Sequence, residues 1–350
     1  MFDLSSLVRP HILQLKPYAS ARDEYTGREG IFLDANENPF QSVAGGAYNR
    51  YPDPLQRTLK ARIAALKQVA AERIFLGNGS DEPIDLLIRA FCEPGRDHIM
   101  LLPPTYGMYQ VSADINRVET VPIPLTRDFQ LDTEEIIASS RPATKLIFIC
   151  SPNNPTANCM RQSDISLILR HAPGLVVVDE AYIDFAPDQT LTHWLETHPN
   201  LVILQTFSKA WGMAALRLGM GFAHPEVIAV LNKIKPPYNL SGLTQEVALE
   251  ALDHADTKDL LVHNILEGRA WLTQQLETLP AVQQVFPSDA NFILARITDA
   301  DTVYHRLTDR QIIVRNRSRV ILCEDCLRIT VGTPLENEAL IQALRAVTQP

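Results

Sequence analysis

The sequence lacks an apolar run long enough to cross a membrane, because no stretch approaches the roughly 18 apolar residues that a spanning helix needs. Its first residues, Met1-Phe2-Asp3-Leu4, also lack the basic start and apolar run of a secretion signal. Five cysteines in 350 residues are few, and their odd number does not suit a secreted disulfide framework. We therefore expect a cytoplasmic protein with no membrane partner.

Clustered basic charge is missing as well. The chain has 32 Lys and Arg against 41 Asp and Glu, which gives a formal net charge of −9 at pH 7. Proteins that bind nucleic acid need massed Lys and Arg to displace counterions from the phosphates, so no nucleic-acid partner is expected. Apolar material is plentiful, since 46% of the residues are hydrophobic. That amount suffices for one large core and a smaller domain.

Internal repeats and low-complexity segments are also absent, so the order of strand-like and helix-like stretches has to predict the architecture. Short apolar runs typical of buried strands occur at 74–76, 98–102, 145–149, 175–178 and 201–205. Helical patterns separate them, such as the one at 81–91, which has acidic residues and Pro83 in its first turn. This alternation predicts an α/β fold with a mostly parallel sheet covered by helices on both faces.

The C-terminal third follows another pattern and predicts a smaller α+β domain. Helices are expected around 260–276 and 337–347, with strand-like stretches at 291–296, 312–315 and 326–331. The expected division is an N-terminal segment at 1–45 that contributes to the small domain and an active-site lid, a large domain at 46–245, and a small domain at 246–350.

Polar residues follow the apolar runs, at the strand ends where parallel sheets bind ligands. The four stretches are Gly77-Asn78-Gly79-Ser80-Asp81-Glu82, Ser151-Pro152-Asn153-Asn154-Pro155-Thr156, Asp179-Glu180-Ala181-Tyr182, and Thr206-Phe207-Ser208-Lys209 with Arg217 beyond it. Singly, the lysine could be a surface cation, the Asn-Pro pair a turn, and the aspartate a helix cap. Their occurrence in this order favours a functional site.

These stretches resemble the fold-type I aminotransferases that depend on pyridoxal 5'-phosphate (PLP), over about Tyr18 to Gly332. The resemblance implies a seven-stranded, mostly parallel sheet flanked by helices in the large, PLP-binding domain. It also implies that Lys209 holds PLP as a Schiff base. Once the substrate amine has displaced it, Lys209 would move a proton between the substrate and cofactor carbons.

The same resemblance implies the other contacts of the cofactor. Asp179 would keep the pyridine nitrogen protonated, and Asn154 and Tyr182 would donate hydrogen bonds to the phenolate oxygen. Lys209, Asp179 and Tyr182 are thus the expected catalytic residues. The phosphate would bind a helix N-terminus and an arginine. The remaining cofactor contacts are Gly79, Ser80, Asp81, Tyr106, Thr206, Ser208 and Arg217. Tyr106 would stack on the ring, and a packing role stays open for both tyrosines.

Other stretches resemble the histidinol-phosphate aminotransferase branch of this family, namely 33–39, 50–54, 103–109 and 327–333. Enzymes of this branch move an amino group between histidinol phosphate and 2-oxoglutarate, giving imidazole-acetol phosphate and glutamate. Their anion pocket therefore meets both phosphate and carboxylate, which an arginine fork can bind. By resemblance, the substrate contacts are Tyr18, Asn36, Arg315 and Arg328. A structural ion pair stays open for Arg328, and surface charge stays open for Arg315.

Tyr51 carries an implication about assembly, because the family places this tyrosine on the cofactor phosphate of the opposite subunit. A homodimer with two composite sites is therefore expected. One departure from the family is Ala157, where glycine is usual.

Three alternative functions stay open. A phosphothreonine decarboxylase or an aromatic aminotransferase would share the cofactor residues. A ligand-sensing domain of a transcription factor would need a basic helix-turn-helix segment, which this sequence lacks. Cys323 and Cys326 have metal or redox spacing but form a single pair without nearby histidines, so no metal is expected.

Overall fold

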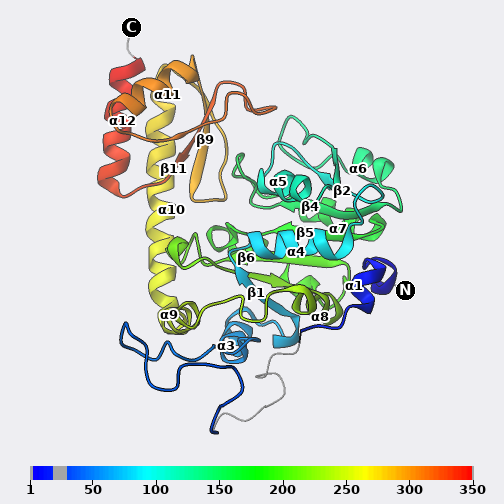
Figure 1. Ribbon diagram of the computed structural model, residues 1–350. Helices are drawn as coiled ribbons and strands as arrows, with labels where there is room; N and C mark the ends of the chain where they lie inside the picture. Colours follow the sequence, from blue (N-terminus) through cyan, green and yellow to red (C-terminus); the bar gives the residue numbers. More distant parts are fainter. Residues whose placement is uncertain (1–2, 19–29, 349–350) are drawn as a thin grey trace.

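The computed structural model describes residues 3–18 and 30–348, and it contains two sheets connected by a long helix (Figure 1). The strands of the larger sheet are β1 (Ile74–Asn78), β2 (His98–Leu101), β3 (Glu119–Pro122), β4 (Thr144–Cys150), β5 (Leu175–Asp179), β6 (Leu201–Thr206) and β7 (Leu218–Phe222). Their order is β1-β7-β6-β5-β4-β2-β3. Strands β2 to β6 pair in parallel, and β7 runs antiparallel to both its neighbours. The predicted mostly parallel, seven-stranded sheet is confirmed.

Alternate residues of the buried strands enter two different cores, one on each face of this sheet. In β5, Val176 and Val178 belong to one core, whereas Leu175 and Val177 belong to the other. The first core also contains residues from α3 (Arg57–Lys67), α6 (Thr133–Ser139), α7 (Gln162–His171), α9 (Gly242–Leu252) and α10 (Ala255–Glu277). The second contains residues from α4 (Asp81–Phe91), α5 (Met108–Ile115) and α8 (Pro225–Ile234). The sheet is therefore covered on both faces, as predicted.

The smaller sheet is antiparallel throughout, in the order β10-β11-β9-β8. Its strands are β8 (Val282–Val285), β9 (Phe292–Ile297), β10 (Arg315–Asn316) and β11 (Cys326–Thr330), and its helices are α11 (Ala300–Asp309) and α12 (Pro334–Thr348). Leu327 and Ile329 pack into the core under these helices, whereas Cys326 belongs to the core of the large sheet. One face of the small sheet is thus turned toward the large one.

Some predicted elements match the structure and others differ from it. The helix at 81–91 has the predicted bounds, because Asp81 and Glu82 stand in its first turn and its apolar residues recur at helical spacing. The stretch 312–315 was predicted as a strand, and this is largely wrong, since β10 has two residues. Strands β3 and β7 were not predicted. β3 is short and partly exposed, and β7 contains two glycines that weaken its strand pattern.

The N-terminal residues divide into two parts. Leu4, Leu7 and Val8 pack into the core beside α4 and α8, and α1 (Pro10–Gln14) contacts α8. Residues 30–56 form no helix or strand and lie near α3 and α9 (Figure 1). The expected boundary at 245/246 falls inside α9. Within residues 3–18 and 30–348, no helix is both long and apolar enough to span a membrane.

Short 3₁₀ turns complete the described structure. They are η1 (Leu4–Ser6), η2 (Ala71–Arg73), η3 (Ile183–Phe185), η4 (Pro187–Gln189), η5 (Thr192–Trp194) and η6 (Ala214–Leu216). Of these, η6 bears on the site, because Arg217 follows it directly and precedes β7.

Candidate active site

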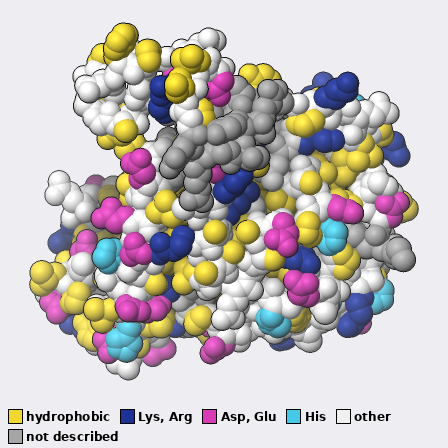
Figure 2. All heavy atoms as spheres, turned by 90° about the horizontal axis from the view of Figure 1, so that it is seen from below, with side chains coloured by type: hydrophobic (Ala, Val, Ile, Leu, Met, Phe, Trp, Pro, Cys, Tyr) yellow, Lys and Arg dark blue, Asp and Glu magenta, His cyan; other side chains and the backbone are white. Residues whose placement is uncertain are grey.

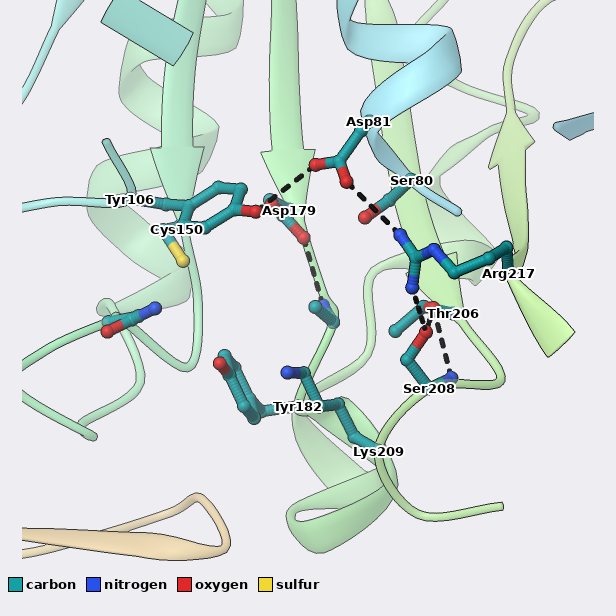
Figure 3. Close-up of a pocket in the computed structure, with 12 residues that line it drawn as sticks. Ser80, Asp81, Tyr106, Cys150, Asp179, Tyr182, Thr206, Ser208, Lys209 and Arg217 are labelled. Atoms are coloured by element: carbon teal, nitrogen blue, oxygen red, sulfur yellow. Dashed lines mark hydrogen bonds and ion pairs between the residues drawn. The ribbon is translucent and has the colours of Figure 1, made fainter. Parts of the chain in front are cut away.

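The carboxyl ends of β1, β4, β5 and β6 converge on one pocket, as expected for parallel strands (Figure 3). The residues that line it are Ser80, Asp81, Tyr106, Cys150, Asn154, Asp179, Ala181, Tyr182, Thr206, Ser208, Lys209 and Arg217. Every cofactor contact named from the sequence lies among them except Gly79 and Tyr51. The four polar stretches, far apart in the chain, therefore meet in space.

One end of the pocket is rich in donors for an anion. Arg217 donates from Nη1 to Ser208 Oγ at 3.3 Å and pairs through Nη2 with Asp81 Oδ2 at 3.3 Å. Thr206 Oγ1 donates to the same hydroxyl at 3.0 Å. Helix α4 begins at Asp81, so its unpaired backbone N–H groups lie here too. A phosphate would compete with the Asp81 carboxylate for the Arg217 fork.

Two glycines permit the close packing behind this anion end. Gly79 has φ +67°, and a Cβ placed on it would lie 2.5 Å from Arg217 Nη2. Its backbone N–H donates to the Arg217 carbonyl at 2.7 Å. A Cβ on Gly219 of β7 would lie 2.2 Å from the carbonyl carbon of Gly79. Gly79 therefore shapes the anion end of the pocket, although it does not line the pocket itself.

Asp179 is a buried carboxyl group at the floor of the pocket. Its Oδ2 accepts a hydrogen bond from the Tyr109 hydroxyl at 2.6 Å, and its Oδ1 accepts one from the Ala181 N–H at 3.0 Å. Burial raises the pKa of Asp179 to about 6, although the two hydrogen bonds act in the opposite direction. A positive partner facing this group would favour its charged form.

Tyr109 holds Asp179 in place and was not assigned a role from the sequence. It is fully buried, stacks on Phe148 with ring centroids 4.7 Å apart, and meets the Tyr106 ring edge-on at 5.5 Å. Its position in α5, one turn after Tyr106, brings both tyrosines to this side of the pocket. That spacing is the signal by which sequence reasoning could have found it.

Lys209 and Tyr182 lie across the pocket from Asp81 and Ser80 (Figure 3). Lys209 Nζ is 5.3 Å from the centroid of the Tyr182 ring. Partial burial lowers the pKa of Lys209, and the positive charge of Arg328 lowers it further, whereas Asp179 acts to raise it. The amine form of Lys209, which is the nucleophile, is thereby favoured.

Arg328 of β11 reaches the pocket from the small sheet. It donates from Nη1 to Asn154 Oδ1 at 2.5 Å, and its guanidinium lies 5.3 Å from the Phe292 ring centroid. Because the Asn154 oxygen accepts this bond, its N–H₂ group stays available to a ligand. The Nε of Arg328 is buried and has no partner. Arg315 pairs with Arg328 across β10 and β11 and is exposed.

Besides Gly79, Arg315 and Arg328, three further predicted residues are not among those that line this pocket. Tyr18 is 75% exposed, and Asn36 is exposed with φ +53°. Tyr51 is 52% exposed, stacks on Tyr238 at 4.5 Å, and lines a second pocket together with Asn36. Contacts from these residues to a ligand at Lys209 stay predictions.

Ala157 and the pair Cys323 and Cys326 are two further features of the sequence. Ala157 is fully buried with φ +70°, a left-handed conformation that explains why glycine is usual at this position. Cys323 and Cys326 are buried free thiols. Among the described residues, no group of three or more His, Cys, Asp or Glu side chains is placed to hold a metal.

The donor set fits PLP, the cofactor that the sequence resemblance implies. A phosphate matches Arg217, the serine hydroxyls and the start of α4. A protonated pyridine nitrogen matches the buried Asp179 carboxylate, and an aldehyde matches the Lys209 amine. The cradle at Gly79, which a Cβ would fill, leaves space for close approach of the anion.

Comparisons with known proteins agree with this geometry. The family model for aminotransferase class I and II matches residues 25–344. The chain therefore belongs to the aminotransferase class I and II family. It is 58% identical over 344 residues to the histidinol-phosphate aminotransferase of Cytophaga hutchinsonii, covering 98% of this chain and 99% of that one. It is 53% identical over 345 residues to the enzyme of the same name from Parabacteroides distasonis, covering 99% of both.

A solved structure supports the fold. Histidinol-phosphate aminotransferase from Sinorhizobium meliloti in complex with pyridoxal-5'-phosphate matches with a TM-score of 0.79 and 24% identity, covering 89% of each chain. At this identity the match shows that the fold is shared.

Proposed function

We propose that the chain is a PLP-dependent aminotransferase that moves an amino group between L-histidinol phosphate and 2-oxoglutarate in L-histidine biosynthesis. The products would be imidazole-acetol phosphate and L-glutamate. The observation that carries the proposal is the convergence of Lys209, Asp179 and Arg217 on one pocket, with Arg328 hydrogen-bonded to Asn154 at its edge. The near-full-length identity to relatives of that name supports the substrate.

When bound, PLP would accept the electron pair released as a C–H bond of the substrate breaks. Arg217, Ser208 and the start of α4 would bind its phosphate, while Asp179 would hold the ring nitrogen. Lys209, with its lowered pKa, would take the proton from the substrate carbon and donate it to the cofactor carbon. Arg328 would orient the substrate through its anionic group.

We further propose a homodimer in which Tyr51 contacts the cofactor phosphate of the opposite subunit. The Glu37 carboxylate accepts hydrogen bonds from the Tyr51 N–H at 2.6 Å and from Arg50 at 2.7 Å, which ties Tyr51 to the preceding segment. In that segment Leu33 and Phe40 are strongly exposed. Figure 2 shows hydrophobic side chains, in yellow, between charged ones over the face seen from below. The concentration of exposed apolar residues in this one segment, which also includes Ile31 and Val43, is typical of a surface that a partner covers.

The five free thiols suit a reducing compartment, so we propose the cytoplasm as the site of action. Tyr18 and Asn36 are proposed to close over the substrate, and Arg315 is proposed to assist Arg328.

The decisive assay supplies purified, PLP-loaded protein with histidinol phosphate and 2-oxoglutarate. We expect glutamate to form, together with a change in the visible absorption of the cofactor. The Lys209→Ala variant should lose turnover by several orders of magnitude, because proton transfer and amine exchange both depend on this group. Release of carbon dioxide from threonine phosphate, or turnover of phenylalanine instead of histidinol phosphate, would point to an alternative function.

A further inference from the structure

Three arginines lie on the same face of the small sheet. In the register of β10 and β11, Arg315 stands opposite Arg328, and the Arg317 N–H donates to the Cys326 carbonyl at 2.9 Å. Side chains alternate along a strand, and directly opposed residues share a face. Arg315, Arg317 and Arg328 are therefore on one face, together with Cys326, which packs into the core of the large sheet.

Arg317 is close to the candidate active site. Partial burial lowers the pKa of Arg317, and the positive charges of Arg328 and Arg315 lower it further. Tyr182, which lines the pocket, acts to raise it. Tyr182 in turn contacts Phe292 with ring centroids 5.0 Å apart, and the Arg328 guanidinium lies 5.3 Å from the centroid of the same Phe292 ring. Arg317 thus lies on the face of the small sheet from which Arg328 reaches the pocket.

None of these three arginines has an acidic partner within the described part of the chain. Arg317 Nε is buried and unpartnered, as is Arg328 Nε. Uncompensated, partly buried guanidinium groups repel one another and are costly unless an anion is bound between them. No residue within 3–18 or 30–348 supplies such an anion, so we infer that a ligand does.

We propose that Arg317 is a third substrate-anion residue, which binds the phosphate of the substrate together with Arg328 and Arg315. This inference rests on the proposed function and adds a residue that determines specificity. A phosphate has three terminal oxygens and two negative charges, so it can engage more guanidinium groups than a carboxylate with two oxygens and one charge. Arg317 should therefore favour the phosphorylated substrate over glutamate.

The test compares Arg317→Gln with Arg319→Gln, an exposed arginine in the same connection, and with Arg317→Lys. All are prepared as PLP-loaded enzyme, so that the Arg217 end is already filled. We expect Arg317→Gln to raise KM for histidinol phosphate about ten-fold or more, and KM for glutamate by about two-fold or less. kcat and the visible spectrum should change little. Arg317→Lys should recover part of the loss, because it keeps the charge without the fork.

A second measurement does not depend on turnover. Inorganic phosphate should raise the melting temperature of the loaded wild-type and Arg319→Gln proteins more than that of Arg317→Gln. Equal losses for the two substrates, matching behaviour of the two glutamine variants, or an unchanged response to phosphate would overturn the inference. Wild-type protein that fails to use histidinol phosphate would instead overturn the proposed function, and the phosphate titration would still test Arg317.

Discussion

Asp179 governs the charge balance of the pocket at the scale of single residues. It is buried at the floor of the pocket, and its pKa of about 6 lies close to physiological pH. The charged form of Asp179 is supported by the two hydrogen bonds that it accepts, from Tyr109 and from the Ala181 backbone. A small change in either bond should therefore alter the pH at which the site works.

Tyr109→Phe tests this dependence. Loss of the hydroxyl removes a hydrogen bond to the carboxylate, so the pKa of Asp179 should rise above about 6. Because the proposed reaction needs charged Asp179, the acidic limb of kcat/KM should move to higher pH by about one unit, and PLP should bind less tightly. The pH profile and a PLP titration measure the two effects.

The matched control is Tyr304→Phe on α11, a partly buried tyrosine distant in sequence from the pocket residues. It should leave the acidic limb where it is in the wild type. An acidic limb at the same pH in Tyr109→Phe and wild type would contradict the assigned role of Tyr109.

The ligand-contacting roles of residues at strand ends could be predicted from the sequence. The roles of residues that act by positioning or supplementing those residues could not. Lys209, Asp179 and Arg217 stand in stretches that a family shares, and ten of the named residues line one pocket. Tyr109 and Arg317 received no role, because a buried aromatic and one arginine among several have no distinctive local pattern. Their surroundings depend on tertiary packing, which brings α5 to Asp179 and β10 beside β11.

At the scale of elements, β7 explains how the anion end is built. This strand lies between β1 and β6 and runs antiparallel to both. It therefore begins beside the carboxyl ends of its neighbours, which places the preceding Arg217 at the edge of the pocket. Gly219 of β7 lies directly against the Gly79 backbone. Sequence patterns missed β7 because its two glycines lower its strand propensity, yet those glycines allow the close approach.

Gly219→Ala should therefore disrupt the anion end. The added Cβ would lie 2.2 Å from the Gly79 carbonyl carbon and 2.3 Å from the Ser80 backbone nitrogen, so backbone has to move. We expect PLP to bind at least ten-fold more weakly and the protein to be destabilised by about 1–3 kcal/mol. A PLP titration and chemical denaturation measure these changes.

Gly221→Ala is the matched control in the same strand. There the new Cβ would meet side chains at 3.7 Å or more, an ordinary contact distance. Its PLP affinity should stay close to that of the wild type. If both alanine variants bind PLP normally, the close contact between β7 and the Gly79 loop has no role in holding the cofactor.

At the scale of the whole molecule, the predicted site residues are divided between two separate pockets of the described chain. Tyr51 and Asn36 lie at a second pocket near α9, while Lys209 lies at the strand ends of the large sheet. The sequence resemblance predicts both groups as ligand contacts and assigns Tyr51 to the site of the opposite subunit. A dimer with composite sites would unite them.

Mixing two inactive variants tests the composite site. Lys209→Ala lacks the amine, and Tyr51→Ala would lack the phosphate contact supplied to the neighbouring site. After denaturation and joint refolding, random pairing makes half of the dimers mixed, and each mixed dimer regains one site in which Lys209 and Tyr51 are both intact. Activity should therefore return to about a quarter of the wild-type value, measured as glutamate formation per subunit. If each subunit instead used its own Tyr51, no pairing would restore activity, and the mixture would show only the sum of the two variants refolded separately.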